Sequence, residues 1–441
     1  MNVLLLVSCL SLMPNATYEA TWESIDSRPN PEWFADAKFG IFIHWGIYAV
    51  PAWGPKDRYA EWYWNHMQKK ESPTWKFHME TYGEKFFYQD FAPLFKAELY
   101  DPEFWVKLFE RAGARYVVLT SKHHDGFSMW PDPHNWNWNC MDIGPHRDLA
   151  GELIEAGRKR GLKMGLYYSL YEWFNPVYLS NVRAYVDTYM LPQLKDLVER
   201  YRPDIIWPDG EWEHPSDTWR STEFLAWLFN ESSAPKDIVI NDRWGKEYRS
   251  RHGGFATPEY QHRADGPLMD AGRFEECQGM GQSFGYNRNE DAESYRSATQ
   301  LLHVLIDIVS RGGNLLLNVG PSADGRIPII MQQRLLDMGA WLEVNGEAIY
   351  GTRPLADAPQ LENVRFTTKP EALYAICLTW PGESIVLPKV AAGASKVTAS
   401  LLGYEPSLKA RIEGDAVHVD IPCIPIDKMP CQHAYVLKIQ W

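Results

Sequence analysis

Short apolar runs, each ending in polar or aromatic residues, recur along most of the chain. Continuous apolar character over such lengths is typical of strands that are buried on both faces, as in a parallel sheet. Helical patterns separate several of the runs, so the sequence predicts strands that alternate with helices. The predicted strands cover Phe39–His44, Tyr116–His123, Lys163–Ser169, Asp204–Asp209, Asp237–Asp242 and Asn314–Gly320, and three predicted helices cover Arg147–Arg160, Ser294–Ser310 and Pro328–Val344.

Two α/β folds fit this alternation, a (β/α) barrel and a doubly wound open sheet. No GxGxxG or GxxxxGK[ST] loop follows a predicted strand, and the informative polar residues follow the strands, where barrel sites are built. We therefore expect a barrel-like domain over residues 21–352. From about residue 353 the helical pattern stops. Runs such as Ala372–Thr379 and Ser384–Leu387 then lie between Pro and Gly turns, which predicts a small antiparallel β-domain over residues 353–441.

The charge balance bears on the partners of this chain. It has 44 Lys and Arg against 57 Asp and Glu, a net charge of −13, which argues against nucleic acid as the main partner. The first residues, MNVLLLVSCLSLMP, form an apolar run of signal-peptide length within residues 1–20, too short to span a bilayer. No later run is long enough to do so, and we expect no membrane partner.

Two kinds of residue bear on a secretory route. Asn15-Ala16-Thr17 and Asn230-Glu231-Ser232 are glycosylation sequons, which matter only if the chain enters a secretory pathway. The six cysteines lack CxxC spacing, so the sequence indicates neither a zinc ribbon nor a dense disulfide framework. Whether Cys423 and Cys431 form a bridge is left open.

Aromatic residues are the unusual part of the composition, with 20 Trp, 23 Tyr and 18 Phe. Most will be ordinary core side chains. Several Trp stand among polar residues, however, as Trp136 and Trp138 do in HNWNWN. The C–H faces of a pyranose pack on aromatic rings while its hydroxyls need polar groups, so this pattern favours a sugar site.

Two motifs suggest other chemistries, and both are weak. Gly281–Gly285 matches the GxSxG elbow of serine esterases, but a polar stretch follows where a helix is needed. His44, His123 and His124 could suggest a metal site, but adjacent strand residues point to opposite faces. Hydroxyl recognition by neutral histidines is the better interpretation, since each ring offers one donor and one acceptor.

Carboxylates follow several of the predicted strands. Asp209, in the motif IIWPDGEW, stands at the end of a predicted buried strand. Asp242, Glu259 and the pair Glu275-Glu276 come later in the chain. Two carboxyl groups at one barrel mouth are what glycoside hydrolysis requires: one attacks or stabilises the oxocarbenium-like centre, and the other protonates the leaving oxygen. Residue pattern alone thus predicts a glycosidase and does not name its sugar.

The motifs resemble those of the retaining α-L-fucosidases, glycoside hydrolase family 29, and look closest to the animal tissue enzymes. The resemblance runs from about Trp33 to Tyr350 and implies a (β/α)-barrel-like catalytic domain with a C-terminal antiparallel β-sandwich. The motifs that carry it are FGIFIHWG at His44, AEWY at Glu61, TSKHHDGF at His123, GPHRDL at 144–149, WPDGEW at Asp209, NDRWG at Arg243, SFGYN at 283–287 and GGNLLLNVGP at 312–321.

By this resemblance Asp209 is the nucleophile that forms a covalent fucosyl-enzyme. Glu259 is our choice of acid/base, with Glu275 as the alternative, and we expect Arg243 to keep the neighbouring Asp242 ionised rather than protonated. The hydroxyl-binding groups that the resemblance implies are His44, Glu61, Trp62, His123, His124, Tyr167 and Arg243, and the aromatics implied around the fucose methyl are Phe42, Trp207 and Phe284.

The resemblance implies an exo-acting enzyme that releases terminal α-linked L-fucose from oligosaccharides or glycoproteins with retention, by double displacement. We expect no cofactor and no metal, because the two carboxylates carry the acid, base and nucleophile roles. A secreted or lysosomal protein is expected, or a periplasmic one in a bacterium, and the sequence leaves open whether it forms a homo-oligomer. The alternative is a non-catalytic fucose-binding protein derived from the enzyme.

Overall fold

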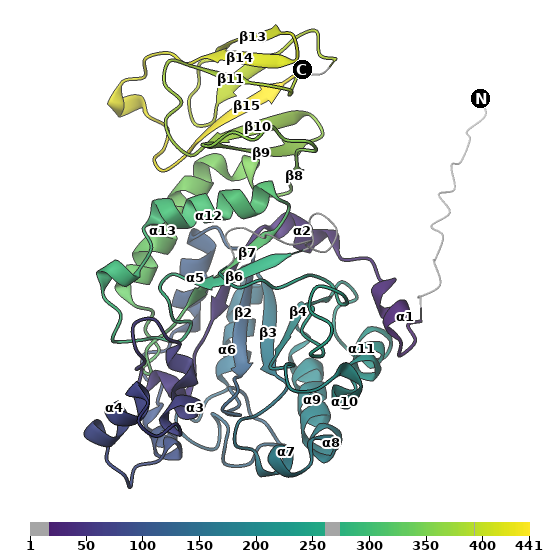
Figure 1. Ribbon diagram of the computed structural model, residues 1–441, viewed down its shortest axis with the longest axis vertical. Coiled ribbons are helices and arrows are strands. Elements are labelled where there is room, and N and C mark those ends of the chain that lie inside the picture. The colour runs from purple at the N-terminus through teal and green to yellow at the C-terminus, as the bar shows by residue number, and fades with distance from the viewer. Residues whose placement is uncertain (1–16, 261–273, 392) are drawn as a thin grey trace, which may run out of the picture.

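A computed structural model describes residues 17–260, 274–391 and 393–441 (Figure 1). The predicted signal segment therefore lies almost wholly outside the described residues, as does the Asn15 of the first sequon. At the second sequon the Asn230 side chain accepts from the Tyr18 N–H at 2.9 Å and donates to its carbonyl at 2.7 Å. Among the described residues no helix is both long and apolar enough to cross a bilayer.

A seven-stranded parallel sheet forms the centre of the larger domain, in the order β5-β4-β3-β2-β1-β7-β6. All six predicted strands are present, and their buried apolar residues explain the continuous hydrophobic runs. From β1 to β5, neighbours in the chain are neighbours in the sheet, as are β6 and β7, and β7 returns to pair with β1, as in a barrel. The strands are β1 (Phe39–Ile43), β2 (Tyr116–Lys122), β3 (Lys163–Ser169), β4 (Ile205–Asp209), β5 (Val239–Ile240), β6 (Glu275–Gly279) and β7 (Asn314–Val319).

The gap between β5 and β6 is occupied by the segment 256–259. It lies parallel to β6, with bridges from Ala256 to Phe274 and from Glu259 to Cys277. Two backbone hydrogen bonds hold it: the N–H of Glu275 donates to Ala256 at 2.8 Å, and that of Cys277 donates to Pro258 at 3.1 Å. The sheet is thereby barrel-like, and Glu259 lies at the same end as the carboxyl ends of the strands.

Strand β6 was not predicted, and the sequence analysis wrongly grouped Glu275 with residues that follow strands. The sequence EECQG contains two acids and lacks the apolar run that marks the other strands. All five of its residues are nevertheless buried, and Glu275 pairs with Asn314 at the start of β7. Glu275 thus lies at the amino end of a strand, below the barrel mouth.

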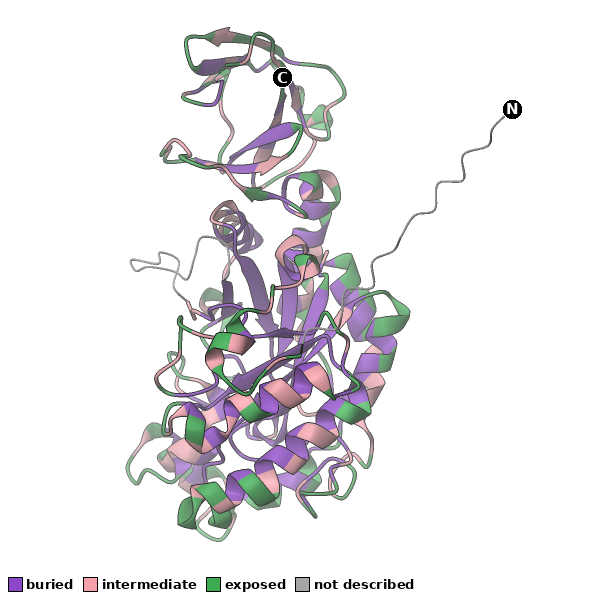
Figure 2. Cartoon of the chain, turned by 90° about the vertical axis from the view of Figure 1, so that its right-hand side faces the viewer, coloured by how far each residue is buried: buried purple, intermediate pink, exposed green. Residues whose placement is uncertain are grey.

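Helices cover the outside of the barrel, with buried inner faces and exposed outer ones (Figure 2). The three predicted helices are present with shifts of a few residues: Asp148 caps the first and Ser297 the second through their side chains, and Pro328 precedes the third. The α-helices of the barrel domain are α1 (Trp22–Asp26), α2 (Glu32–Ala37), α3 (Tyr63–Met67), α4 (Pro73–Thr81), α5 (Pro102–Arg111), α6 (Leu149–Lys159), α7 (Pro176–Ser180), α8 (Val182–Tyr185), α9 (Leu191–Tyr201), α10 (Ser216–Trp219), α11 (Ser221–Asn230), α12 (Ala298–Ser310) and α13 (Ile329–Asn345).

Short helical turns complete the connections. One of them, η2, carries two of the predicted site residues, and η4 is a π-helical turn between α8 and α9. Their bounds are η1 (Ile47–Ala49), η2 (Ala60–Trp62), η3 (Tyr88–Leu94), η4 (Val186–Met190), η5 (Ala292–Ser294), η6 (Gly346–Ala348) and η7 (Ile426–Lys428).

The C-terminal region is an antiparallel β-sandwich, as the resemblance implied. One sheet has the order β12-β15-β10-β9-β8 and the other β11-β14-β13. Cys423 and Cys431 are both free thiols, so no bridge joins them. The strands are β8 (Arg353–Pro354), β9 (Val364–Lys369), β10 (Ala372–Cys377), β11 (Ser384–Leu387), β12 (Thr398–Leu401), β13 (Lys409–Glu413), β14 (Ala416–Asp420) and β15 (Tyr435–Gln440).

Helices α12 and α13 lie between the barrel and the sandwich (Figure 1). The indole of Trp341 on α13 donates to the carbonyl of Ala434 at 2.9 Å, and Thr299 on α12 contacts the His433 ring at 2.7 Å. Tyr374 and Val436 of the sandwich belong to the same apolar cluster as the barrel core. The two domains therefore share part of their core.

Helix α13 packs closely on α5 at Gly339, and this contact can be tested. A Cβ at residue 339 would lie 1.9 Å from the carbonyl oxygen of Arg111. Gly339→Ala should therefore destabilise the fold by about 1–3 kcal/mol, although alanine favours a helix by about 1 kcal/mol. Urea unfolding measures the change. Glu343→Ala, at an exposed position of the same helix, is the control, and equal stability of the two variants would contradict the packing argument.

Candidate active site

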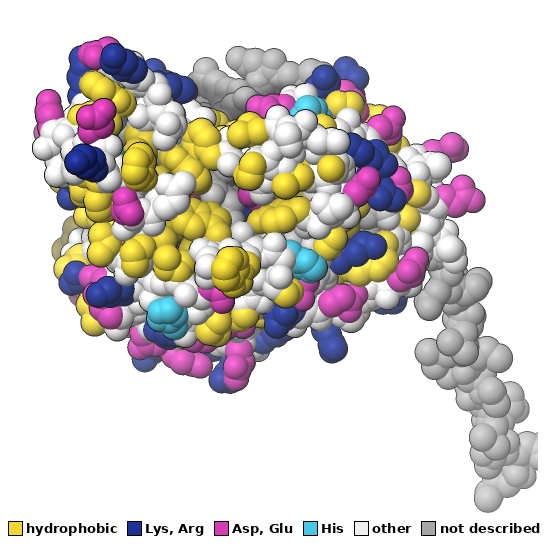
Figure 3. Space-filling model, turned by 90° about the horizontal axis from the view of Figure 1, so that it is seen from below, with side chains coloured by type: hydrophobic (Ala, Val, Ile, Leu, Met, Phe, Trp, Pro, Cys, Tyr) yellow, Lys and Arg dark blue, Asp and Glu magenta, His cyan; other side chains and the backbone are white. Residues whose placement is uncertain are grey.

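A pocket of about 80 Å³ opens at the carboxyl ends of the strands. Figure 3 looks onto this end of the molecule, where hydrophobic side chains gather around a hollow. Of the predicted site residues, twelve line the pocket and Glu275 does not. The lining residues are Phe42, His44, Tyr59, Glu61, Trp62, His123, His124, Tyr167, Trp207, Asp209, Trp212, Arg243, Glu259, Cys277 and Phe284.

Asp209, the last residue of β4, is buried and held at both carboxylate oxygens. Its Oδ1 accepts from Arg243 Nη1 at 2.6 Å, and its Oδ2 accepts from the Tyr167 hydroxyl at 2.9 Å. Burial alone would raise the pKa of Asp209, but Arg243, His124 and Arg249 outweigh it and lower the pKa to about 2. The carboxylate is therefore ionised at neutral pH, in the form that a nucleophile needs.

Arg243 connects this carboxylate to Glu259. Its guanidinium is 1% exposed and donates through Nη2 to Glu259 Oε1 at 2.5 Å, and through Nε to the Thr257 hydroxyl at 2.8 Å. The guanidinium carbon also lies 4.5 Å from the centre of the Trp207 ring. Two carboxylates from different parts of the barrel thus contact one buried cation, which brings them close together at the pocket.

The three histidines of the pocket are neutral. Burial lowers the pKa of His44 to about 3 and that of His124 to about 4, and it holds that of His123 well below its usual value. His44 Nδ1 lies 2.7 Å from Asn318 Oδ1, and His124 Nδ1 lies 2.6 Å from the Ser169 hydroxyl. With Nδ1 engaged, Nε2 of His44 remains for a ligand, and Nε2 of His124 lies 3.6 Å from Asp209 Oδ2. Neutral rings held in this way suit hydroxyl groups.

Glu61 is a buried residue of the pocket lining, and the GxSxG stretch holds it. Its Oε2 accepts from the Gly285 N–H at 2.7 Å and lies 3.3 Å from the Ser283 hydroxyl. Burial raises the pKa of Glu61 to about 7. Ser283 also donates to the Gly285 carbonyl at 2.7 Å, so this serine supports a neighbouring acid and does not form an esterase elbow.

Aromatic rings form one wall of the pocket. Phe42 lies 5.1 Å from Trp207 and 6.4 Å from Phe284, measured between ring centres. Tyr59 packs on Phe284 at 5.4 Å. This wall lies beside the polar groups, since the ring centre of His44 is 4.5 Å from that of Phe42 and 4.8 Å from that of Phe284. The pocket therefore offers both an apolar surface and polar groups, as a deoxygenated sugar requires.

Two predicted carboxylates have other partners. Glu275 accepts from the Tyr116 hydroxyl at 2.5 Å and from the Trp207 indole at 2.8 Å, in the barrel interior below the pocket. Asp242 accepts from the Thr257 hydroxyl at 2.6 Å and from the Ser250 N–H at 2.8 Å. These groups, and not the expected Arg243 guanidinium, are its hydrogen-bond partners. Arg243 turns instead toward Asp209 and Glu259.

The pocket contains three residues that the sequence analysis did not predict: Tyr59, Trp212 and Cys277. Trp212 is part of the WPDGEW motif, and its position two residues after Gly210 could have indicated it. Cys277 could not be placed, because strand β6 was not recognised. Tyr59 precedes η2 and carries no motif of its own.

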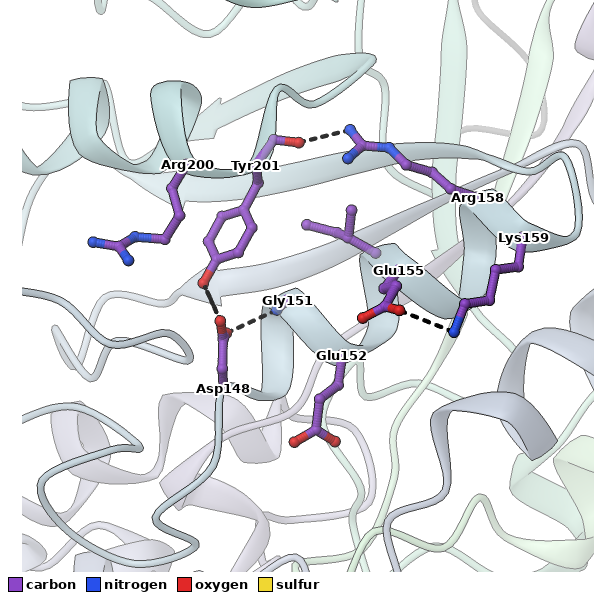
Figure 4. A pocket seen from close by; sticks show the side chains of 9 residues that line it. Asp148, Gly151, Glu152, Glu155, Arg158, Lys159, Arg200 and Tyr201 are labelled. Carbon is purple, nitrogen blue, oxygen red and sulfur yellow. Dashed lines mark hydrogen bonds and ion pairs between the residues drawn. The ribbon is translucent and has the colours of Figure 1, made fainter.

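A larger open pocket, of about 630 Å³, lies on the outside of the barrel between α6 and α9 (Figure 4). Asp148 accepts there from the Tyr201 hydroxyl and the Gly151 N–H, and Arg158 donates to the Tyr201 carbonyl. These groups satisfy one another and join the two helices. The smaller pocket, at the carboxyl ends of the strands, contains Asp209 and Glu259 and therefore has the groups for acid–base and nucleophilic chemistry.

No group of three or more His, Cys, Asp or Glu side chains among the described residues is arranged to hold a metal ion. Two of the pocket histidines, His44 and His124, are instead hydrogen-bonded to Asn318 and Ser169, as given above.

A barrel with two carboxylates, hydroxyl-binding groups and an aromatic wall at the carboxyl ends of its strands defines a glycoside hydrolase site. The comparisons with known proteins agree. Residues 5–347 match the α-L-fucosidase family, and residues 359–440 match the α-L-fucosidase C-terminal domain. The chain therefore belongs to the α-L-fucosidases of glycoside hydrolase family 29.

Individual relatives match over nearly the whole chain. Tissue α-L-fucosidase of Rattus norvegicus is 45% identical, with 96% of this chain and 92% of that protein covered. The Homo sapiens tissue enzyme is 42% identical, with 97% and 92% covered. The structure of Thermotoga maritima α-fucosidase with a mechanism-based inhibitor has a TM-score of 0.83 and 39% identity, with 96% of this chain and 100% of that one covered.

The position of Glu275 predicts a pH effect on stability. Burial raises its pKa from 4.5 to about 7, so the folded protein binds its proton more tightly than the unfolded chain does. Folding stability should therefore fall as the pH rises from 4.5 to 7, by at most roughly 3 kcal/mol from this group. Glu275→Gln, which stays neutral, should gain thermal stability relative to wild type at pH 7.5 but not at pH 4.5.

Thermal unfolding at the two pH values measures this difference. Glu84→Gln, at an exposed position, is the matched control and should show no such dependence. A Glu275→Gln variant that is destabilised equally at both pH values would contradict the assignment of a protonated, buried acid.

Proposed function

We propose that this protein is an exo-acting enzyme that hydrolyses terminal α-L-fucosides with retention, using Asp209 as nucleophile and Glu259 as acid/base. The observation that carries the proposal is the contact of both carboxylates with the Arg243 guanidinium inside one pocket. Retaining glycosidases need two carboxyl groups about 5–5.5 Å apart, and a shared guanidinium keeps its two partners within such a range.

The state of Asp209 suits the first step. The lowered pKa keeps the carboxylate ionised, and its position at the end of β4 points it into the pocket. Attack on the anomeric carbon forms a carboxylate ester with fucose, and the bond to the leaving oxygen breaks. Tyr167 donates to Asp209 Oδ2 and so helps to fix the orientation of the attacking group.

Glu259 suits the partner role better than Glu275 does. It lines the pocket and its side chain is 30% exposed, so a leaving group and then a water can reach it. Glu275 is fully buried under Trp207 and has no access to the pocket. In the first step Glu259 gives its proton to the leaving oxygen, and in the second it takes one from the attacking water.

The aromatic wall supports fucose as the sugar. Fucose carries a methyl group where galactose carries a hydroxymethyl group. Phe42, Trp207 and Phe284 accommodate the methyl, whereas a hydroxyl there would lose its hydrogen bonds, at a cost of about 1–3 kcal/mol. His44, His123 and His124, with Glu61 and Trp62, would then bind the ring hydroxyls. Thermotoga maritima α-fucosidase, to which this chain is similar, has been solved in complex with fucose.

We infer fucosylated oligosaccharides or glycoproteins as substrates, and a secreted or lysosomal location. The tissue and plasma α-L-fucosidases of Homo sapiens, at 42% and 40% identity, support this inference. The alternative, a non-catalytic fucose-binding protein, would require loss of a reacting carboxylate, and Asp209 and Glu259 are both present. Turnover of 4-nitrophenyl α-L-fucoside by the wild-type protein distinguishes the two.

Asp209→Ala should fold and lose more than about 10³-fold in turnover of aryl α-fucosides, because no other group can form the ester. Added azide can enter the space left by the Asp209 side chain and attack the anomeric carbon directly, from the face opposite the leaving group. The product should then be the inverted β-L-fucosyl azide, identified by NMR. Near-wild-type activity in a folded variant would refute the nucleophile assignment.

Glu259→Ala should lose about 10²–10⁴-fold on a natural disaccharide, whose leaving group needs a proton, and much less on formation of the fucosyl-enzyme from an activated aryl fucoside. Azide needs no deprotonation and should restore breakdown of the intermediate, giving the retained α-L-fucosyl azide. Glu275→Ala is the control, with an expected uniform loss and no azide rescue. The reverse pattern in the two variants would make Glu275 the acid/base.

A further inference from the structure

A second ion pair lies behind the nucleophile. Arg249 Nε donates to Glu211 Oε1 at 2.6 Å, and Arg249 Nη2 lies 3.8 Å from Asp209 Oδ1. Neither Glu211 nor Arg249 was among the predicted site residues, and neither lines the pocket. One guanidinium therefore lies between the nucleophile and another carboxylate.

The burial of Glu211 is unusual for a carboxylate. The residue is 1% exposed, and its Oε2 has no hydrogen-bond partner among the described residues. Gly210, at φ +76°, forms the turn between the end of β4 and Glu211. A Cβ on residue 210 would lie 2.4 Å from the Tyr171 ring, so the turn requires glycine. Burying a charged group with one unpaired oxygen costs free energy, so Glu211 lowers the stability of the folded protein.

We propose that Glu211 is a positioning residue that holds Arg249 beside Asp209 and away from its attacking oxygens. Arg249 is 38% exposed and long enough to move. Without Glu211 it would close the 3.8 Å gap and pair directly with Asp209, whose oxygens already bind Arg243 and Tyr167. A carboxylate paired with two guanidinium groups is a poorer nucleophile, because attack must break more hydrogen bonds.

The pair also balances the charge of the site through the reaction, on the roles proposed above. Before reaction Glu259, as the proposed acid, carries a proton, and the two arginines, Arg243 and Arg249, face the carboxylates Asp209 and Glu211. When Asp209 becomes a neutral ester, Glu259 has given up its proton and carries the second negative charge. With Glu211 ionised, the two arginine charges are therefore balanced by two carboxylate charges at both stages. The other titratable groups nearby are Tyr171, which faces both Glu211 and Asp209, and His124 and Arg243, which face Asp209.

A double-variant cycle tests the proposal. Glu211→Gln should lower kcat/KM for an aryl α-fucoside about tenfold or more, since the released Arg249 pairs with the nucleophile. Arg249→Gln should also lower it, because Glu211 is left as an uncompensated charge. The double variant removes both charges and should recover to within about threefold of wild type. Losses that multiply in the double variant would overturn the proposal.

The pH dependence separates this role from a structural one. Arg249→Gln removes a cation from Asp209, which raises the pKa of the nucleophile, so activity at pH 4 should fall relative to pH 6. Glu211→Gln removes an anion and lowers that pKa, so it should show no such fall. The double variant should follow wild type. Identical pH profiles in all four proteins would mean that the pair only supports the fold.

Two comparisons keep the outcomes distinct. The surface pair of Arg160 and Glu110, with an Nη1–Oε2 distance of 2.7 Å, gives a matched set of Gln variants that should leave kcat/KM unchanged. Thermal unfolding of each protein corrects for loss of folded enzyme. If wild type itself does not turn over the fucoside, the proposed function fails; if wild type is active and the cycle is multiplicative, only this inference fails.

Discussion

The buried guanidinium of Arg243 organises both the active site and the closure of the barrel. A cation that is 1% exposed needs compensating charge and hydrogen bonds, and Asp209, Glu259 and Thr257 supply them to Arg243. Through Asp209 it reaches the end of β4, and through Thr257 and Glu259 it reaches the segment that fills the space between β5 and β6. The same interaction that brings the carboxylates together therefore also fixes the strand-like segment on which one of them lies.

The other polar groups of the pocket suit a ligand without charge, such as a neutral sugar. Sugar hydroxyls need donors and acceptors that do not change with pH, and buried histidines with lowered pKa values suit that need. Asn318 and Ser169 set which ring nitrogen faces the pocket. The rings of Phe42 and Phe284, which pack against His44, have no polar group to offer. Polar and apolar groups thus lie side by side in one small pocket.

The sequence predicted most of the fold and of the site because both depend on local patterns. The buried strands are apolar runs, and their ends carry the motif residues, so Asp209 and the histidines could be placed from the chain alone. Strand β6 could not, because its polar sequence is stabilised by tertiary contacts such as those of Glu275 with Tyr116 and Trp207. For the same reason Cys277 was missed and Glu275 was grouped with the wrong end of the barrel. The contacts of Asp242, and the pairing of Arg249 with Glu211, depend on loop geometry that no spacing rule contains.

The core shared by α12, α13 and the sandwich has a consequence for how such a protein can change over generations. Trp341 contacts Ala434 across the junction, and Tyr374 packs into the barrel's cluster. A substitution on that face of the sandwich is therefore also a substitution in the barrel core, and it needs a matching change on the helices. Recombination that exchanged the sandwich for one from a distant gene would break this match. The two domains must be inherited together, although only one of them contains the chemistry.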